Sequence, residues 1–389
     1  MAPNLFGTSA TLYLEASQQD VHQGKPPTDN AESQKKQIHN ISQPSRKYEW
    51  KIVWRNVIAF VYLHVGAVYG LYLILTDINI WTTIWVASVA IICSLGITVG
   101  AHRLWSHRSY KAKWPMRFAL MLCQTTAFQN HIYEWVRDHR VHHKFTDTDA
   151  DPHNAQRGFF FSHIGWLLVR KHPEVFKKGA TIDMSDLEQD PIIVWQRKLY
   201  IVLMPLCCFF FPMWVPCYFW NETTLNSWYA NVFRYTLSLN LTWLVNSAAH
   251  IWGVKPYDNT IGPTENRAVA FCALGEGWHN YHHVFPWDYK AAELGNYKMN
   301  LSTAVIDLCA KLGLAYDLKT IPTDIVKKRA MRTGDGSRYT YALYVLNDKY
   351  FVVSVLFPFH SHEGAKWGWG DKDMEPEEIE EVEIRNKGD

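Results

Sequence analysis

Eight histidines fall into three short groups whose spacing suits metal binding. The groups read HRLWSH, HRVHH and HNYHH. In a helical HxxHH segment the histidines lie three and four positions apart, so their imidazoles project from one face. The HxxxxH group is less regular, because five residues turn a helix by about 140°. Its two rings can share a target only if the helix distorts or if they reach opposite sides of one ion. The histidines are His102 and His107, then His139, His142 and His143, then His279, His282 and His283.

This donor set indicates two metal ions. Eight imidazoles exceed the four ligands that one zinc ion takes. Imidazole binds Fe, Cu, Ni and Zn alike, so spacing leaves the element open. Soluble di-iron bundles rely on Glu and Glu-x-x-His ligands, whereas these groups offer almost pure nitrogen. Neutral ligands leave more positive charge on the cluster, which favours a strongly oxidising centre.

A ninth candidate, His250, ends the run WLVNSAAH. Asn246 precedes it by one helical turn on the same face, and its amide could orient a metal-bound water. His250 could equally be a helix-end histidine whose ring reaches the membrane interface. Spacing alone favours neither interpretation. We interpret the other histidines as ordinary: His22, His39, His64, His131, His153, His163, His172, His360 and His362.

Four apolar stretches must position these groups. They cover about 57–75, 81–99, 200–220 and 228–249, and each is long and uncharged enough for a membrane helix. Short turns join them into two hairpins. Lys and Arg are absent from both turns and frequent beyond the opposite ends, so the positive-inside bias predicts lumenal turns and cytosolic termini. The alternative, core helices of a large soluble protein, fits this asymmetry less well.

Composition supports a membrane protein with reduced cysteines. Hydrophobic residues make up 48% of the chain, yet net charge is only +2, so no basic field indicates nucleic acid. The seven cysteines form no CxxC pair. Residues 1–45 are polar and predict a disordered cytosolic tail. The chain has neither GxGxxG nor CxxCH, so electrons for redox chemistry must come from a partner.

The chain resembles the animal acyl-CoA desaturases, the stearoyl-CoA desaturase group, over about residues 48–335. The motifs that carry the resemblance are GAHRLWSHRSYKA, YEWVRDHRVHHKFTDTDADPHN, RGFFFSHIGWLLVRKHPEV, LTWLVNSAAH and GEGWHNYHHVFPWDY, and the tail WGWGDKD is similar to that of insect members. The resemblance implies an all-α membrane protein with four transmembrane helices in two hairpins. A cytosolic helical cap, from 101–198 and 251–335, would hold a histidine-ligated di-iron centre within a desaturase domain at 46–335.

The resemblance also implies an activity and its partners. The enzyme would use O2 to introduce a cis double bond into a saturated fatty acyl-CoA, at the Delta-9 position or alternatively at Delta-11. It would lie in the endoplasmic reticulum membrane and take electrons from cytochrome b5 and its NADH-dependent reductase. Two Fe2+ ions would be bound by the eight grouped histidines and His250, with Asn246 acting through water.

The resemblance further places the acyl-CoA head group. Physically, a nucleotide with several phosphates favours Arg and Lys at the cytosolic rim. Without the resemblance, Arg170 and Lys171 would be interpreted as ordinary basic flanks of a membrane helix. The implied substrate-binding residues are Asn56, Asn130, Arg137, Asp138, Arg170, Lys171 and Trp243.

Two other functions share some of these features. A membrane hydroxylase would use the same histidine pattern but add oxygen instead of removing a second hydrogen. A metal transporter would place ionisable residues within the membrane, whereas these histidines lie beyond the span ends.

The C-terminal region departs from the family pattern. Residues 336–389 form an atypical extension, in which 338–361 resembles an insertion between RTGDGS and WGWGDKD. We hypothesise that this insertion is a retained intron, which sequencing of the transcript would test. The acidic residues from Glu375 to Glu383 predict a solvated tail.

Overall fold

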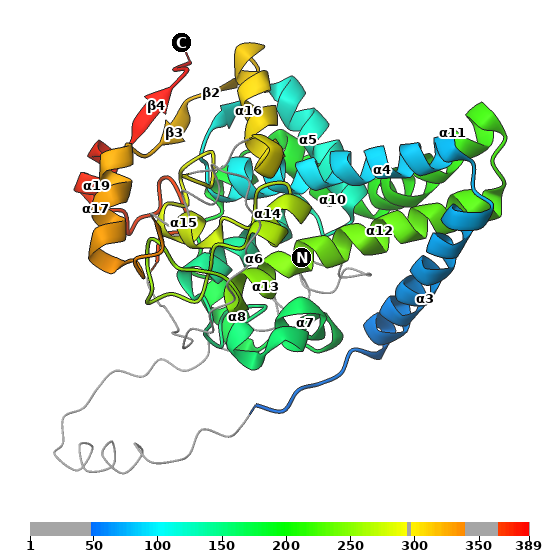
Figure 1. Cartoon of the computed structure of the whole chain (residues 1–389), viewed down its shortest axis with the longest axis horizontal. Helices are drawn as coiled ribbons and strands as arrows, with labels where there is room; N and C mark the ends of the chain where they lie inside the picture. The colour runs from blue at the N-terminus through cyan, green and yellow to red at the C-terminus, as the bar shows by residue number, and fades with distance from the viewer. Residues whose placement is uncertain (1–47, 294–296, 339–364, 389) are drawn as a thin grey trace, which may run out of the picture.

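The protein consists of a stem of long helices joined to a compact helical cap (Figure 1). The computed structural model describes residues 48–293, 297–338 and 365–388. The predicted N-terminal tail and almost all of the predicted insertion lie outside these residues. The stem helices are α3 (Trp54–Thr76), α4 (Ile80–Leu95), α10 (Pro191–Pro205), α11 (Phe211–Trp220) and α12 (Thr224–Asn246).

Within the described residues, three helical segments are long and apolar enough to cross a membrane: Trp54–Thr76, Ile80–Ser106 and Pro191–Trp220. They correspond to three of the four predicted spans. The second is longer than predicted, because α4 continues into the π-helix η2 (Gly96–Ser106). The third is also longer, because α10 already begins at Pro191, and the π-helix η5 (Leu206–Phe210) joins α10 to α11.

The fourth predicted span lies in α12, which does not reach the same apolarity. At 23 residues it is about 35 Å long, enough to cross a bilayer. Its buried side, however, carries Asn231, Arg234 and Ser238. Arg234 is satisfied by neutral groups, donating to the Cys208 carbonyl at 2.8 Å and to Asn231 Oδ1. A fourth membrane crossing therefore stays a prediction.

The two hairpin turns meet at one end of the stem. Glu222 Oε2 accepts from the backbone N–H of Asn79 at 3.0 Å and from the Thr82 hydroxyl at 2.7 Å. Asn226 Nδ2 donates to Asp77 Oδ2 at 2.8 Å. This contact places both turns on the same side of the molecule, as the hairpin prediction requires.

A Gly-x-x-x-Gly pair on α3 lets α12 approach closely. A Cβ atom added at Gly70 would lie 2.2 Å from the backbone oxygen of Tyr229. One turn earlier, a Cβ at Gly66 would lie 3.2 Å from a Val232 methyl group. Small residues at such a contact allow the helix–helix packing that holds membrane bundles together.

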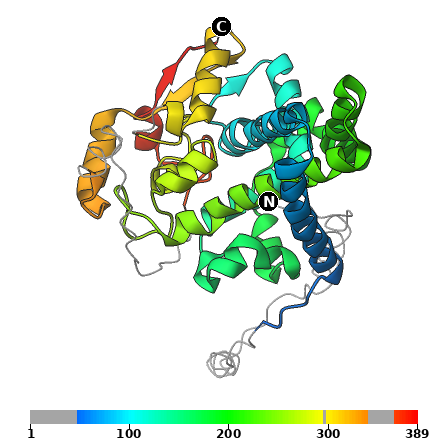
Figure 2. The same cartoon turned by 45° about the vertical axis from the view of Figure 1, so that its right-hand side comes forward.

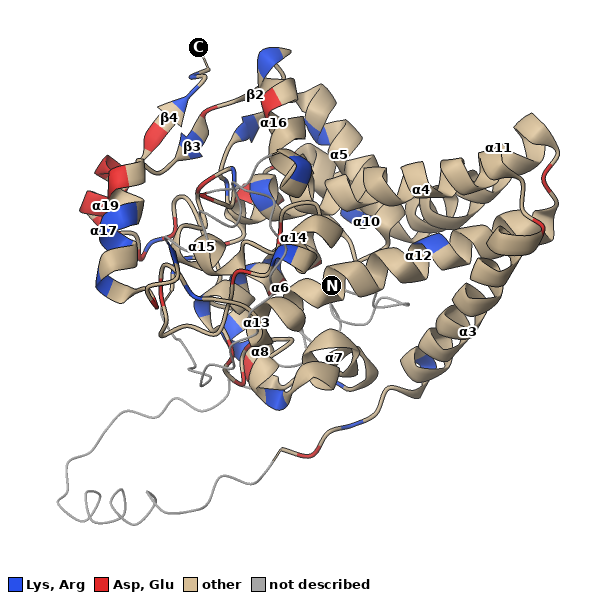
Figure 3. Cartoon of the chain, viewed as in Figure 1, with Lys and Arg blue, Asp and Glu red and all other residues tan. Residues whose placement is uncertain are grey.

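Charged residues are frequent on the cap and sparse on stem helices α3, α4 and α11 (Figure 3).

The cap is mostly helical, as expected. It also contains two short antiparallel strand pairs that the sequence patterns did not predict: β1 (Lys111–Ala112) with β2 (Ala315–Tyr316), and β3 (Leu318–Thr320) with β4 (Glu383–Arg385). Its helices are α5 (Trp114–Ala127), α6 (Ile132–Lys144), η3 (Ala155–Arg157), η4 (Phe161–Gly165), α7 (Trp166–Leu168), α8 (Pro173–Gly179), α9 (Ser185–Glu188), α13 (Ala248–Ile251), α14 (Arg267–Cys272), α15 (His279–Val284), η6 (Tyr297–Met299), α16 (Leu301–Lys311), α17 (Thr323–Thr333) and α19 (Pro376–Glu380).

The acidic C-terminal segment takes part in the cap. Strand β4 pairs with β3, and α19 begins with a capping box formed by Glu375 and Glu378. The two views agree that this segment (red) lies on the cap, far from α11 (Figure 1, Figure 2).

Candidate metal centre

Nine histidines from four short segments converge at the junction of stem and cap. His102 lies near the end of η2 and His107 directly follows it, whereas α6 and α15 carry one HxxHH group each. His250 lies on α13, just beyond α12. All nine are buried. The ring nitrogens form two clusters, each with all its ligand atoms within 4.8 Å of one another. The five-histidine cluster contains His102, His107, His139, His143 and His282, and the four-histidine cluster contains His142, His250, His279 and His283.

Each HxxHH helix serves both clusters. On α6, the first and last histidines of the motif, His139 and His143, belong to the five-histidine cluster, and His142 belongs to the other. On α15 the pattern is reversed, because only His282 belongs to the five-histidine cluster. Three imidazoles on one helix face therefore divide between two targets.

The HxxxxH pair shares one cluster because the helix distorts. Residues 96–106 form a π-helix, in which hydrogen bonds span five residues instead of four. The backbone N–H of His107 donates to the His102 carbonyl at 3.2 Å. This wider turn brings residues five apart onto nearly the same side, which is one of the two solutions that the sequence allowed.

The nitrogen separations fit shared metal ions. Two nitrogens bound at right angles, each about 2.1 Å from one ion, are about 3.0 Å apart. The observed Nε2 separations are 2.9 Å for His102–His282 and for His107–His139. In the four-histidine cluster, Nε2 of His279 lies 3.1 Å from those of both His250 and His283. Lone pairs this close favour a cation between them, and an imidazole set of this size suits first-row metals.

Several imidazoles contact a second group through their other nitrogen. Nδ1 of His102 lies 2.7 Å from Glu276 Oε2, and Nδ1 of His142 lies 2.9 Å from Asp151 Oδ2. His250 Nδ1 is 3.5 Å from Asp147 Oδ2. Such partners fix ring orientation and raise ligand basicity in metal sites. Burial would raise the pKa of Glu276, but the charge of Arg103, the contact with His102 and the hydrogen bonds to Glu276 together outweigh this effect and lower it, so the carboxylate stays ionised.

Six of the clustered imidazoles are held neutral, the form that binds metals. Burial is the largest cause, and repulsion from neighbouring imidazoles adds to it. Together they lower the pKa well below 6.5 for His107, His139, His143, His279, His282 and His283.

A cavity runs from the clusters into the stem. It brings ring atoms of His102 and His279 together with apolar side chains such as Ile97 and Leu241. Asn246 also lines it, and its Nδ2 atom is buried without a hydrogen-bond partner among the described residues. An unpartnered amide beside the histidines is available to a water or ligand. The remaining lining residues are Ser94, Thr98, Trp135, His139, His142, His153, Thr242, Val245, Cys272, Ala273 and Glu276.

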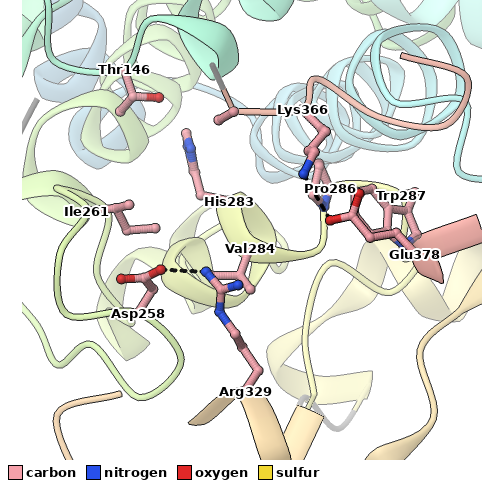
Figure 4. Close-up of a pocket in the computed structure, with 11 residues that line it drawn as sticks. Thr146, Asp258, Ile261, His283, Val284, Pro286, Trp287, Arg329, Lys366 and Glu378 are labelled. Atoms are coloured by element: carbon pink, nitrogen blue, oxygen red, sulfur yellow. Dashed lines mark hydrogen bonds and ion pairs between the residues drawn. The ribbon is translucent and has the colours of Figure 1, made fainter. Parts of the chain in front are cut away.

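A second pocket opens on the cap side of the four-histidine cluster (Figure 4). His283 reaches it between Thr146 and Ile261. Two ion pairs border the pocket: Arg329 with Asp258 at 2.6 Å, and Lys366 with Glu378 at 3.0 Å.

Three of the predicted head-group residues form one ionic cluster at the cap surface. Arg137 Nη2 contacts Asp138 Oδ1 at 2.9 Å, and Lys171 Nζ contacts the other Asp138 oxygen. Burial would raise the pKa of Asp138, but the charges of Lys171 and Arg137 lower it. Arg170 is exposed, and its backbone N–H donates to the Lys51 carbonyl.

The other predicted head-group residues lie on neighbouring elements. Asn56 on α3 donates from Nδ2 to the Leu167 carbonyl at 2.8 Å, and its Oδ1 is buried with no hydrogen-bond partner in the part of the chain that the structure describes. Trp243 on α12 is fully buried against Phe60, and none of the described residues accepts a hydrogen bond from its Nε1. Asn130 is buried, with a φ of 67°, just before α6. Asn56 and Trp243 thus offer buried polar atoms that a bound molecule could satisfy.

Comparison with known proteins identifies the family. The fatty acid desaturase family profile matches residues 79–293, more than half of the chain and all nine clustered histidines. The chain belongs to the fatty acid desaturase family. This desaturase is 54% identical over 390 residues to "Acyl-CoA Delta-9 desaturase" of Acheta domesticus, an alignment that covers 100% of this chain and 99% of the relative.

Other relatives show that the enzyme is an acyl-CoA desaturase without fixing the bond position. "Acyl-CoA Delta12-desaturase" of Acheta domesticus is 53% identical over 364 residues, covering 92% of this chain and 95% of the relative. "Acyl-CoA Delta(11) desaturase" of Trichoplusia ni is 50% identical over 331 residues, covering 85% and 87%. Membership in this family implies an acyl-CoA substrate and O2. The names of these relatives differ in the position of the double bond, so similarity alone does not assign that position.

Sequence reasoning missed the carboxylates and the carbonyl that contact the second ring nitrogen of several histidines. Glu276 precedes His279 by three residues, and Asp151 follows the second histidine group, so carboxylates near the motifs were an available signal. His153 was treated as ordinary, yet its ring lies 4.4 Å from that of His142 and its Nδ1 is 3.4 Å from Asp151. The Trp367 carbonyl, which accepts from His107 Nδ1, had no local signal, because it lies 260 residues away.

Proposed function

We propose that the two histidine clusters bind two Fe2+ ions and that the enzyme is an acyl-CoA Delta-9 desaturase of unsaturated fatty acid biosynthesis. The observation that carries this proposal is the convergence of two nitrogen clusters at the mouth of a largely apolar cavity. The proposed ligands are the nine clustered histidines, with Asn246 acting through a water molecule. Iron bound there would supply, with O2, the oxidising power to remove hydrogen from unactivated CH2 groups.

The tasks of the protein are positioning and exclusion of water. Side chains such as Ile97, Leu241 and Val245 would hold adjacent CH2 groups beside the clusters. Alignment of the reacting carbons is then set by the cavity and requires no catalytic base. Glu276 and Asp151 would keep His102 and His142 oriented as ligands.

The head group of the substrate would bind at the cap rim. Arg170 is exposed there, and Arg137, Asp138 and Lys171 form the adjacent ionic cluster. Guanidinium groups bind phosphate oxygens bidentately, which suits a nucleotide carrier. Asn56, Asn130 and Trp243 complete the proposed substrate site.

We further propose that the enzyme lies in the endoplasmic reticulum membrane with cytosolic termini, and that α12 completes a four-helix stem. Electrons would come from cytochrome b5 and its NADH-dependent reductase, docking on basic residues of the cap. The positive-inside asymmetry of the hairpins supports this orientation.

Expression in desaturase-deficient yeast tests the bond position. The account predicts that cells regain unsaturated lipids with cis double bonds at the Delta-9 position, and that a His282→Ala variant gives none. Bonds at Delta-11 or Delta-12 would overturn the assigned position but leave the desaturase assignment intact. Hydroxylated chains without double bonds would overturn the proposed chemistry.

A further inference from the structure

A C-terminal segment, residues 367–373, lies across the five-histidine cluster. We call it the strap; it reads WGWGDKD. The Trp367 carbonyl accepts a hydrogen bond from Nδ1 of His107, and the Trp369 N–H donates to the His107 carbonyl at 2.9 Å. Between them, Gly368 lies so close that an added Cβ would be 2.5 Å from the His107 carbonyl oxygen. The strap thus contacts both the ring and the backbone of one candidate ligand.

Two arginines and an aspartate fix the position of the Trp367 carbonyl. Trp367 is 2% exposed, and the Arg140 guanidinium lies 4.0 Å from the centre of its ring. Arg108 lies 4.9 Å from the same ring. The Trp367 N–H donates to Asp371 Oδ2 at 2.9 Å, which closes the strap into a turn. Cation–π contacts of this kind strengthen when they are shielded from water.

The strap is anchored to the helix that supplies other ligands of the same cluster. Lys144, the last residue of α6, contacts Asp371 Oδ1 at 3.0 Å and also contacts Asp373. Arg140 and Lys144 flank His143 on α6, so strap and helix are linked on both sides of that histidine. No comparable contact joins the strap to the four-histidine cluster among the contacts that the structure gives for the described residues.

We propose that the strap is a positioning element for one metal ion, that of the five-histidine cluster. The Trp367 carbonyl fixes which His107 nitrogen carries hydrogen and directs Nε2 toward the cluster. Outer-shell partners of this type commonly change metal affinity by about 10–100-fold when they are removed. The inference rests on the proposed two-metal function, and it makes the C-terminal segment part of that site.

A glycine substitution tests the strap without removing a ligand. Gly368→Ala should push the strap off His107 and leave the purified full-length enzyme with about half of its iron. The matched control is Gly313→Ala, between α16 and β2 and outside the strap, where the glycine is also at positive φ but a new Cβ meets no described atom within 4 Å. Gly313→Ala should keep wild-type iron content. Trp367→Phe, which preserves the backbone and a stacked ring, should lose much less iron than Trp367→Leu.

Mössbauer spectra of 57Fe-loaded protein identify which ion is lost. The iron remaining in Gly368→Ala should match the component that remains in His107→Ala and differ from the one in His283→Ala. A general packing defect would deplete both components together and lower the melting temperature in detergent. That result would overturn the inference, as would full iron occupancy in Gly368→Ala or equal loss in Gly313→Ala. Wild-type enzyme that binds no metal would instead overturn the proposed function itself.

Discussion

Nε2 of His102 lies 2.9 Å from Nε2 of His282, although 180 residues separate them in the chain. The first residue comes from the end of a stem helix and the second from a short cap helix. The pair therefore joins stem and cap at one point. A metal ion shared by these nitrogens would lock the two parts together as well as perform chemistry.

Removing His282 should cost one metal ion and all desaturation. His282→Ala deletes a nitrogen that faces both His102 and His143. Because the cavity left in a buried site is not refilled by another donor, iron per chain should fall by about half. Elemental analysis of purified protein measures this loss. His172→Asn, which keeps an acceptor at the N-cap of α8, is the control and should retain wild-type iron. Full iron content in the His282 variant would argue against the cluster assignment.

The close α3–α12 contact predicts different effects on stability for alanine substitutions at two glycines of α3. Gly70→Ala forces a Cβ to 2.2 Å from a backbone oxygen and should destabilise the stem by about 1–3 kcal/mol. Gly66→Ala meets a Val232 methyl group at 3.2 Å and the Tyr229 ring at 3.6 Å, both side-chain atoms, so a side-chain shift and better helix propensity should leave it near neutral. The melting temperatures of the two variants, measured in detergent, test this difference. Equal melting temperatures would contradict the close backbone approach.

A buried carboxyl beside α15 predicts a pH-dependent stability. Burial raises the pKa of Glu265 from 4.5 to about 8, although its carboxylate accepts from the Tyr281 N–H. A raised folded-state pKa contributes stability that is fully present below 4.5 and lost as pH rises through about 8. Glu265→Gln mimics the protonated form, so its advantage should grow from nearly zero at acid pH to a few kcal/mol above pH 8. Melting curves over this range measure it; parallel pH profiles for the two proteins would exclude the effect.

The proposed head-group site predicts a substrate-dependent defect. Arg170→Gln should raise KM for acyl-CoA about tenfold with little change in kcat, because a contact made equally in ground and transition states affects only binding. With an acyl-pantetheine substrate that lacks the nucleotide, the variant should match the wild type. Lys177→Gln, which removes an exposed charge on α8, should leave both substrates unaffected. A kcat defect with unchanged KM would show that Arg170 acts elsewhere.

Local pattern predicted the elements better than their exact limits. Apolar runs identified α3, α4 and the α10–α11 segment, and the three-and-four spacing correctly placed His139, His142 and His143 on a helix. The π-helix at 96–106 was not predicted, because apolar periodicity does not distinguish helical turns of 3.6 residues from wider ones. The division of each HxxHH motif between two clusters also needs the tertiary arrangement, since no motif specifies which helix faces it.

Distant contacts account for what the sequence could not supply. Arg234 lowers the apolarity of α12, and only the folded chain shows that the Cys208 carbonyl and Asn231 satisfy it. The strap contact to His107 likewise joins residues 260 positions apart. Sequence patterns describe neighbours along the chain, so buried polar partners brought together by folding leave no signal there.

The most direct test of the account is the mass of the product. Iron-loaded enzyme, supplied with stearoyl-CoA, O2, NADH, cytochrome b5 and its reductase, should yield an acyl chain that has lost two hydrogen atoms, and metal-free enzyme should leave the substrate unchanged. A product that gained an oxygen atom, or the same product from metal-free enzyme, would contradict the proposal that these histidine clusters bind the metal of a desaturase.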